Sequence, residues 1–150
     1  MKSSPRVLTI AGSDSGGGAG IQADLKTFAA HGVYGTSAIT AITAQNTSTV
    51  SEILEIPESI VASQIDAVMS DIGADVIKTG MLANSKIVKI VAQKLTEFNN
   101  PITVVDPVMV AKSGDKLLND DAIHAIQKFL IPISTLITPN IPEAETLINM

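Results

Sequence analysis

The chain has 150 residues, the usual size of one domain, with ten Lys and Arg against fifteen Asp and Glu and a net charge of −5. Such an acidic chain lacks the electrostatic footprint of a general nucleic-acid binder, and with no cysteine it has no disulfide, thiol nucleophile or Cys-based zinc site. No apolar run is long enough to span a membrane, and no signal-peptide pattern precedes the first one, so we expect a cytoplasmic protein without a membrane partner.

The first half of the chain alternates short apolar runs with helical periodicity. Residues 7–11 form an apolar run typical of a buried strand, and residues 37–43 and 49–56 predict two further strands. Pro57 lies where helices often begin. Helical spacing predicts two amphipathic helices, with inward-facing side chains at Ile21, Leu25, Phe28 and Ala29 in one and at Val61, Ile65, Val68, Met69 and Ile72 in the other.

The second half repeats this pattern. Short β-branched or apolar runs predict strands at residues 75–79, 101–106 and 136–138. Asn84 or Ser85 is a candidate N-cap for one helix, and Asn119 or Asp120 for the next. Strands that alternate with helices at this spacing predict an α/β fold in which helices cover both faces of a mostly parallel sheet.

A glycine-rich loop, Gly12-Ser-Asp-Ser-Gly-Gly-Gly-Ala-Gly20, follows the first strand. Glycines let backbone N–H groups approach a ligand closely, and the N-terminus of the following helix favours an anion or a polar group. The loop lacks the Lys-Ser/Thr of a Walker A motif and the spacing of a dinucleotide fingerprint. A flexible turn is the alternative interpretation.

Polar side chains also follow the other predicted strands, at residues 45–46, 78–80, 106–107 and 138–140. In open α/β sheets, ligands bind beyond the carboxyl ends of the strands, so these groups predict one assembled pocket. The carboxamide of Gln45 offers both a donor and an acceptor, which suits the ring nitrogen and exocyclic amine of a pyrimidine. A solvated loop amide is the alternative for Gln45.

Three carboxylates, an asparagine and a methionine are further candidates for the site. Asp106 ends an apolar strand and is a candidate Mg²⁺ ligand, which Glu143 could join together with Asn140. Asn140 and Glu143 also have the spacing of a capping box, and the two roles are compatible. Asp24 could stabilise the helix dipole, and Met81 could pack on a planar ring or fill the core.

Six ordered segments together resemble the hydroxymethylpyrimidine/phosphomethylpyrimidine kinases of thiamine biosynthesis, in the ribokinase-like superfamily. The segments are residues 10–28, Thr43-Ala-Gln-Asn-Thr47, Ile77-Lys-Thr-Gly-Met-Leu82, Val105-Asp-Pro-Val-Met109, Ser113-Gly114 and Thr138-Pro-Asn-x-x-Glu143. The resemblance spans the whole chain. It implies a three-layer α/β/α fold and two successive phosphorylations, of hydroxymethylpyrimidine and of its monophosphate, with ATP and Mg²⁺.

The same resemblance assigns roles to individual residues. It implies that Gln45 binds the pyrimidine edge and that the substrate pocket is shaped by Gly12, Ala19, Asp24, Met81 and Val108. It also implies that Asp106 and Glu143 lie at the Mg²⁺ and that Asn140 and Glu143 lie near the ATP phosphates. Phosphoryl transfer depends mainly on positioning and charge neutralisation, so this division of roles is physically reasonable.

Members of this family continue well past residue 150, and residues 142–150 predict the opening of a helix with no stop signal. The anion hole and the residue that activates the acceptor hydroxyl are therefore expected after Met150, and none within residues 1–150. We expect the chain to be the N-terminal part of one kinase domain, inactive alone, and a homodimer at full length. A pyridoxal/pyridoxine kinase of the same fold and a non-catalytic pyrimidine-binding module are the alternatives.

Overall fold

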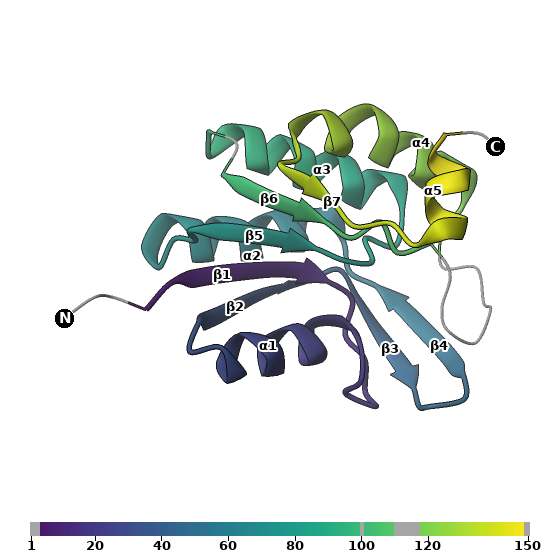
Figure 1. Ribbon diagram of the computed structural model, residues 1–150, viewed down its shortest axis with the longest axis horizontal. Coiled ribbons are helices and arrows are strands. Elements are labelled where there is room, and N and C mark those ends of the chain that lie inside the picture. The colour runs from purple at the N-terminus through teal and green to yellow at the C-terminus, as the bar shows by residue number, and fades with distance from the viewer. Residues whose placement is uncertain (1–3, 100, 110–117, 149–150) are drawn as a thin grey trace.

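The computed structural model describes residues 4–99, 101–109 and 118–148, so the Ser113-Gly114 segment of the resemblance lies outside the described residues. Five strands form a central parallel sheet in the order β2-β1-β5-β6-β7 (Figure 1). Their bounds are Arg6–Ala11 for β1, Tyr34–Ile39 for β2, Val76–Thr79 for β5, Ile102–Val105 for β6 and Leu136–Ile137 for β7. The predicted parallel α/β architecture is confirmed.

Helices lie on both sides of this sheet, with α1 on one side and α2 and α3 on the other (Figure 1). Their bounds are Gly20–Ala30 for α1, Glu58–Asp71 for α2, Ser85–Glu97 for α3, Asp120–Ala125 for α4 and Ile141–Leu147 for α5. A π-helical turn, η1 (Ile126–Leu130), and a 3₁₀ turn, η2 (Ile131–Ile133), continue α4. Among the described residues, no helix is long and apolar enough to cross a membrane.

The main core lies between the sheet and helices α2 to α4. Alternate residues of the strands point to this side, where Leu8, Ile10, Ile77 and Val105 are at most 1% exposed. They belong to one cluster with helix side chains that include Val61, Ile65, Ile87, Val88, Val91 and Leu95. The apolar face predicted for α1 is only partly inward, because Ile21 is buried but Ala29 is exposed.

The opposite face of the sheet is covered unevenly. Helix α1 packs on β1 and β2, and Thr9 beneath it is fully buried. On the same face, further along the sheet, Ile102 of β6 is 56% exposed and Leu136 of β7 is 54% exposed. Parallel sheets are normally buried on both faces, so this exposed apolar strip is unusual within the described part of the chain.

One predicted strand is wrong. Residues 37–43 are not a single strand, because β2 ends at Ile39 and a second strand, β3 (Ala41–Gln45), begins after Thr40. β3 pairs antiparallel with β4 (Val50–Glu55) as a separate hairpin beyond the carboxyl end of β2 (Figure 1). The break has a physical cause: Thr40 is fully buried, and its hydroxyl donates to the carbonyl oxygen of Met81 at 2.7 Å.

The helix caps expected from the sequence are confirmed. Asn84 caps α3, and its side-chain oxygen accepts from the N–H groups of Lys86 and Ile87. Asn119 caps α4 in the same way through the N–H of Ala122. The last predicted helix begins after Asn140 as expected, and it ends at Leu147.

Candidate functional site

Several of the residues predicted for the site, among them Gly12, Met81 and Asp106, follow the carboxyl ends of β1, β5 and β6. From β1, the chain continues to β2 on one side of the sheet, and β5, β6 and β7 are added on the other side. The strand order therefore reverses between β1 and β5, which is where open α/β sheets place their ligands. Gly12 follows β1 at this point, and Lys78 and Met81 lie at the end of β5 and just beyond it.

The glycine-rich loop is packed tightly against the residues after β5. The N–H of Gly12 donates to the carbonyl oxygen of Met81 at 3.1 Å, and a Cβ at Gly12 would lie 2.5 Å from the Met81 methyl carbon. Gly20 has a φ of +55°, and a Cβ there would overlap the carbonyl oxygen of Gly12. At Gly20 the neighbouring atom is backbone and φ is positive, so only a glycine fits there, whereas at Gly12 the neighbouring atom is the far end of a flexible side chain.

The Asp14 carboxylate accepts hydrogen bonds from several backbone N–H groups of the glycine-rich loop. The donors are the N–H groups of Gly16, Gly18 and Ala19 at 2.8–2.9 Å, and Asp14 is only 5% exposed. In this structure these three N–H groups donate to a side chain of the loop itself. The carboxylate lies where an anion would bind at the start of α1 and thereby fixes the loop conformation.

Gln45 is held at the end of β3 by the same loop. The hydroxyl of Ser15 donates to the Gln45 carbonyl oxygen at 2.6 Å and accepts from the Gln45 N–H at 2.7 Å. The Thr43 hydroxyl donates to the Ser13 carbonyl oxygen at 2.7 Å and lies 3.2 Å from the side-chain oxygen of Gln45, which is half-buried. By contrast, the oxygen of Asn46 accepts from the N–H groups of Ser48 and Thr49 and so shapes the hairpin turn.

Asp24 does not act as a helix-dipole carboxylate, because its side chain points to the sheet. It accepts from the Thr9 hydroxyl at 2.6 Å and from the Lys78 ammonium at 2.9 and 3.1 Å. The same ammonium lies 3.5 Å from Asp106, at the end of β6. The three charged side chains are 15–33% exposed, so they form a partly desolvated cluster across α1, β5 and β6.

Asn140 and Glu143 form the capping box that the sequence suggested. The Asn140 oxygen accepts from the Glu143 N–H at 2.9 Å, and the Glu143 carboxylate accepts from the Asn140 N–H at 2.9 Å. The other Glu143 oxygen accepts from the N–H of Met109 in a long 3.4 Å bond, and Glu143 is 6% exposed. This bond joins the start of α5 to the segment after Asp106, in which Val108 also lies.

A magnesium ion would find few protein ligands here. Among the described residues, no group of three or more His, Cys, Asp or Glu side chains is placed to hold a metal. The Asp106 carboxylate is one-third exposed at the strand end, which fits an ion held by one carboxylate, phosphate oxygens and water. Glu143 fits less well as a direct ligand, because each of its oxygens accepts a hydrogen bond from a backbone N–H and keeps fewer lone pairs for a metal.

Contacts connect most of the predicted site residues along this edge of the sheet. The loop residues and Gln45 form one group, and Asp24 and Asp106 form a second through Lys78. The capping box contacts Met109, three residues after Asp106. Sequence reasoning listed neither Asp14, Ser15 nor Lys78 as a site residue. For Asp14 a signal existed, since Asp before small residues often folds back on the backbone. For Lys78 the position at a strand end was predicted, but its pairing with Asp24 was not, because Asp24 is 54 positions away.

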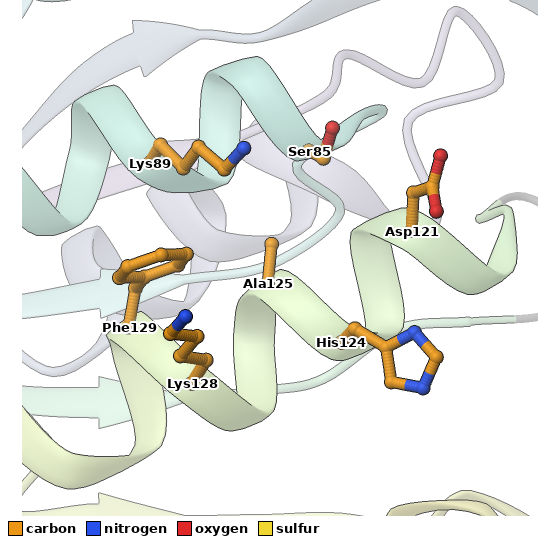
Figure 2. Close-up of a pocket in the computed structure, with 7 residues that line it drawn as sticks. All are labelled: Ser85, Lys89, Asp121, His124, Ala125, Lys128 and Phe129. Atoms are coloured by element: carbon orange, nitrogen blue, oxygen red, sulfur yellow. The ribbon is translucent and has the colours of Figure 1, made fainter.

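A separate groove of about 410 Å³ lies between α3 and the α4–η1 segment (Figure 2). Ser85 and Lys89 line it from α3, and the ammonium groups of Lys89 and Lys128 lie 5.9 and 5.4 Å from the centre of the Phe129 ring. None of the predicted site residues lines this groove. It belongs to the helical layer and not to the strand ends.

Comparisons with known proteins agree with the fold. A family model described as phosphomethylpyrimidine kinase matches residues 14–150. The chain is 52% identical over 145 residues to the hydroxymethylpyrimidine/phosphomethylpyrimidine kinase of Bacillus subtilis (strain 168), covering 97% of this chain and 54% of that protein. The crystal structure of phosphomethylpyrimidine kinase from Clostridium difficile 630 matches with a TM-score of 0.91 and 50% identity, over 97% of this chain and 63% of that one.

The pyridoxal kinase of Staphylococcus aureus, solved with AMP-PCP and pyridoxal, is also similar. It matches with a TM-score of 0.83 and 41% identity, over 97% of this chain and 52% of that one. The chain spans between 26% and 55% of the length of the curated relatives it matches.

Proposed function

Because the chain belongs to the phosphomethylpyrimidine kinase family, we propose that the protein containing it phosphorylates 4-amino-5-hydroxymethyl-2-methylpyrimidine and then its monophosphate. ATP is the phosphoryl donor in this proposal, and thiamine biosynthesis is the process it serves. The observation that carries it is the placement of Gln45, whose backbone Ser15 of the glycine-rich loop holds at the end of β3. A carboxamide there can pair with the ring nitrogen and exocyclic amine of an aminopyrimidine.

Each part of the edge has a role in this reaction. Gly12, Ala19, Met81 and Val108 would line the substrate side, and the hydrogen bond from the Gly12 N–H to the Met81 carbonyl oxygen supports the placement of these two residues together. Asp106 would hold Mg²⁺, which neutralises charge on the transferred phosphoryl group. Asn140 and Glu143 would lie beside the ATP phosphates, with Glu143 acting through its capping box more than as a ligand.

We further propose that residues 1–150 are the N-terminal part of a single ribokinase-like domain. The exposed apolar strip at Ile102 and Leu136 supports this, because a parallel sheet needs cover on both faces. The anion hole and the residue that activates the acceptor hydroxyl would then lie in the remainder of the domain. Residues 1–150 alone should lack kinase activity, since transition-state charge would be left without its main stabilising donors.

The remaining proposals concern the whole protein. We expect it to act as a cytoplasmic homodimer on small-molecule substrates, without a nucleic-acid partner. The acidic net charge of −5 supports the last point. Size-exclusion chromatography with light scattering measures the oligomeric state directly, and a monomer at micromolar concentration would contradict the dimer.

The function is tested by a coupled kinase assay of the full-length gene product, with hydroxymethylpyrimidine and pyridoxal side by side. We expect the higher kcat/KM for hydroxymethylpyrimidine. A higher value for pyridoxal would favour the second candidate, a pyridoxal kinase, which the similarity to the Staphylococcus aureus enzyme keeps open. Binding of hydroxymethylpyrimidine without turnover would identify a non-catalytic pyrimidine-binding module instead.

The role of Gln45 is tested by Gln45→Ala, with Gln93→Ala on the exposed surface of α3 as the matched control. Loss of a buried polar partner should weaken hydroxymethylpyrimidine binding by about 1–3 kcal/mol, measured by calorimetry. The Gln93 variant should bind as the wild type does. Equal affinity in both variants would mean that Gln45 does not contact the pyrimidine.

A further inference from the structure

Lys78 occupies a central place in the sheet, and the sequence assigned it no individual role beyond its position at a predicted strand end. It lies on β5, with β1 on one side and β6 on the other, and it pairs in register with Thr9 and Val104. Paired residues of parallel strands point to the same face, so Lys78 and Thr9 both face α1. Asp106, two residues beyond Val104, continues the same face of β6.

The ammonium of Lys78 contacts two carboxylates unequally. It lies 2.9 and 3.1 Å from the two oxygens of Asp24, which also accepts the Thr9 hydroxyl at 2.6 Å. Its single contact to Asp106 is longer, at 3.5 Å. Asp24 is thus well satisfied by protein donors, whereas Asp106 is held only weakly by the same cation.

This inequality determines the charge that the cluster presents. One ammonium and two carboxylates leave one net negative charge, and the closer contacts assign neutralisation mainly to Asp24. The remaining charge therefore belongs to Asp106, the more exposed carboxylate at the end of the strand. In a partly desolvated cluster, such a charge difference has a larger electrostatic effect than it would have in water.

We propose that Lys78 is a positioning residue that neutralises Asp24 and leaves Asp106 as the single carboxylate charge available to the cation on the transferred phosphate. The inference rests on the proposed kinase function and adds a residue to it. Lys78 links the carboxylate on the substrate side to the carboxylate on the phosphate side. If Lys78 were absent, the carboxylates of Asp24 and Asp106 would form a pair of negative charges with no neighbouring ammonium. Such a pair would attract a divalent cation away from the nucleotide.

Opposite changes of charge should therefore have opposite effects on metal binding. Lys78→Met makes the cluster more negative, so Mn²⁺ should bind the nucleotide-free full-length protein about tenfold more tightly than it binds the wild type. Asp24→Asn frees Lys78 to neutralise Asp106, so the Mg²⁺ concentration for half-maximal velocity should rise several-fold. Electron paramagnetic resonance of Mn²⁺ gives the first quantity and a Mg²⁺ titration of velocity gives the second.

The double variant Lys78→Met/Asp24→Asn restores the original net charge. We expect Lys78→Met to lower kcat about tenfold with little change in the KM for hydroxymethylpyrimidine, and the double variant to recover most of that loss. Lys78→Arg should remain close to wild type in Mn²⁺ binding. Lys86→Met, at the exposed start of α3, is the control for loss of a lysine.

Two results would overturn the inference. One is unchanged nucleotide-free Mn²⁺ binding in Lys78→Met, and the other is a double variant no more active than Lys78→Met. If Lys78→Met does not fold, Asp24→Asn decides the question, because an unchanged Mg²⁺ requirement there contradicts the charge assignment. Failure of the kinase proposal is distinct, since it would appear as a wild-type protein without turnover while the Mn²⁺ measurements remain valid.

Discussion

The hydroxyl of Ser15 is bound at two points to the backbone of Gln45, 30 residues further along the chain. It donates to the carbonyl oxygen at 2.6 Å and accepts from the N–H at 2.7 Å. The glycine-rich loop and the end of β3 are thereby locked together, and the Gln45 side chain projects from a fixed backbone. A loop amide free in solvent would have no such attachment.

Replacing Ser15 should loosen Gln45 without altering its side chain. In Ser15→Ala, both hydrogen bonds are lost, and we expect the KM for hydroxymethylpyrimidine to rise about fivefold, equivalent to about 1 kcal/mol. The kcat should change less, because the phosphate side of the site is untouched. Steady-state kinetics of the full-length protein measure both values. Ser63→Ala, which removes an exposed hydroxyl on α2, is the control, and an equal KM in both variants would contradict the prediction.

Asp14 should be irreplaceable even by asparagine. One of its oxygens accepts from Gly16 and the other from both Gly18 and Ala19, so an asparagine must place an NH₂ group against backbone N–H donors. We expect Asp14→Asn to lower the free energy of unfolding by about 1–3 kcal/mol, measured by urea denaturation. Asp71→Asn, at the exposed end of α2, should change it far less. Equal losses would show that the loop does not depend on the carboxylate.

Replacing Gly20 or Gly32 by alanine should distinguish the energetic cost of a positive φ from the cost of a steric overlap. Both have positive φ, +55° and +69°, but only a Cβ at Gly20 would overlap a backbone oxygen, whereas the space around Gly32 is open. Gly32→Ala should cost about 1–2 kcal/mol of unfolding free energy, from the backbone conformation alone. Gly20→Ala should cost about 1–3 kcal/mol more because the loop must move. Similar urea midpoints for the two variants would argue against the close approach of Gly20 to Gly12.

Features set by neighbouring residues were predictable from the sequence. The caps at Asn84, Asn119 and Asn140 follow from side chains that bond to backbone two or three residues away. The alternation of strands and helices likewise follows from apolar spacing within each segment. The parallel sheet is then the consequence of that order and needs no further information.

Features that depend on distant contacts were not predictable. The break at Thr40 is caused by its bond to Met81, 41 residues later, and the run of small and β-branched residues around it gives no local stop signal. The link from Asp24 to Asp106 passes through Lys78, which is distant from both in sequence. A hydrophobic pattern reports which face is buried, but it does not report which charged groups meet at a strand end.

The exposed ion pair between Arg6 and Asp75 joins the starts of β1 and β5 and should make stability depend on acid pH. The hydrogen bonds from Arg6 hold the pKa of Asp75 below its ordinary value of 3.8. A lowered folded-state pKa means that this stabilisation is fully present above about pH 4 and is lost as pH falls through the folded pKa. Asp75→Asn should therefore lower the free energy of unfolding at pH 7, and this effect should shrink as the pH falls through the folded-state pKa of Asp75, as measured by urea denaturation at each pH. Arg6→Gln should reduce the same pH dependence, and a full acid dependence in Asp75→Asn would assign it to other carboxylates.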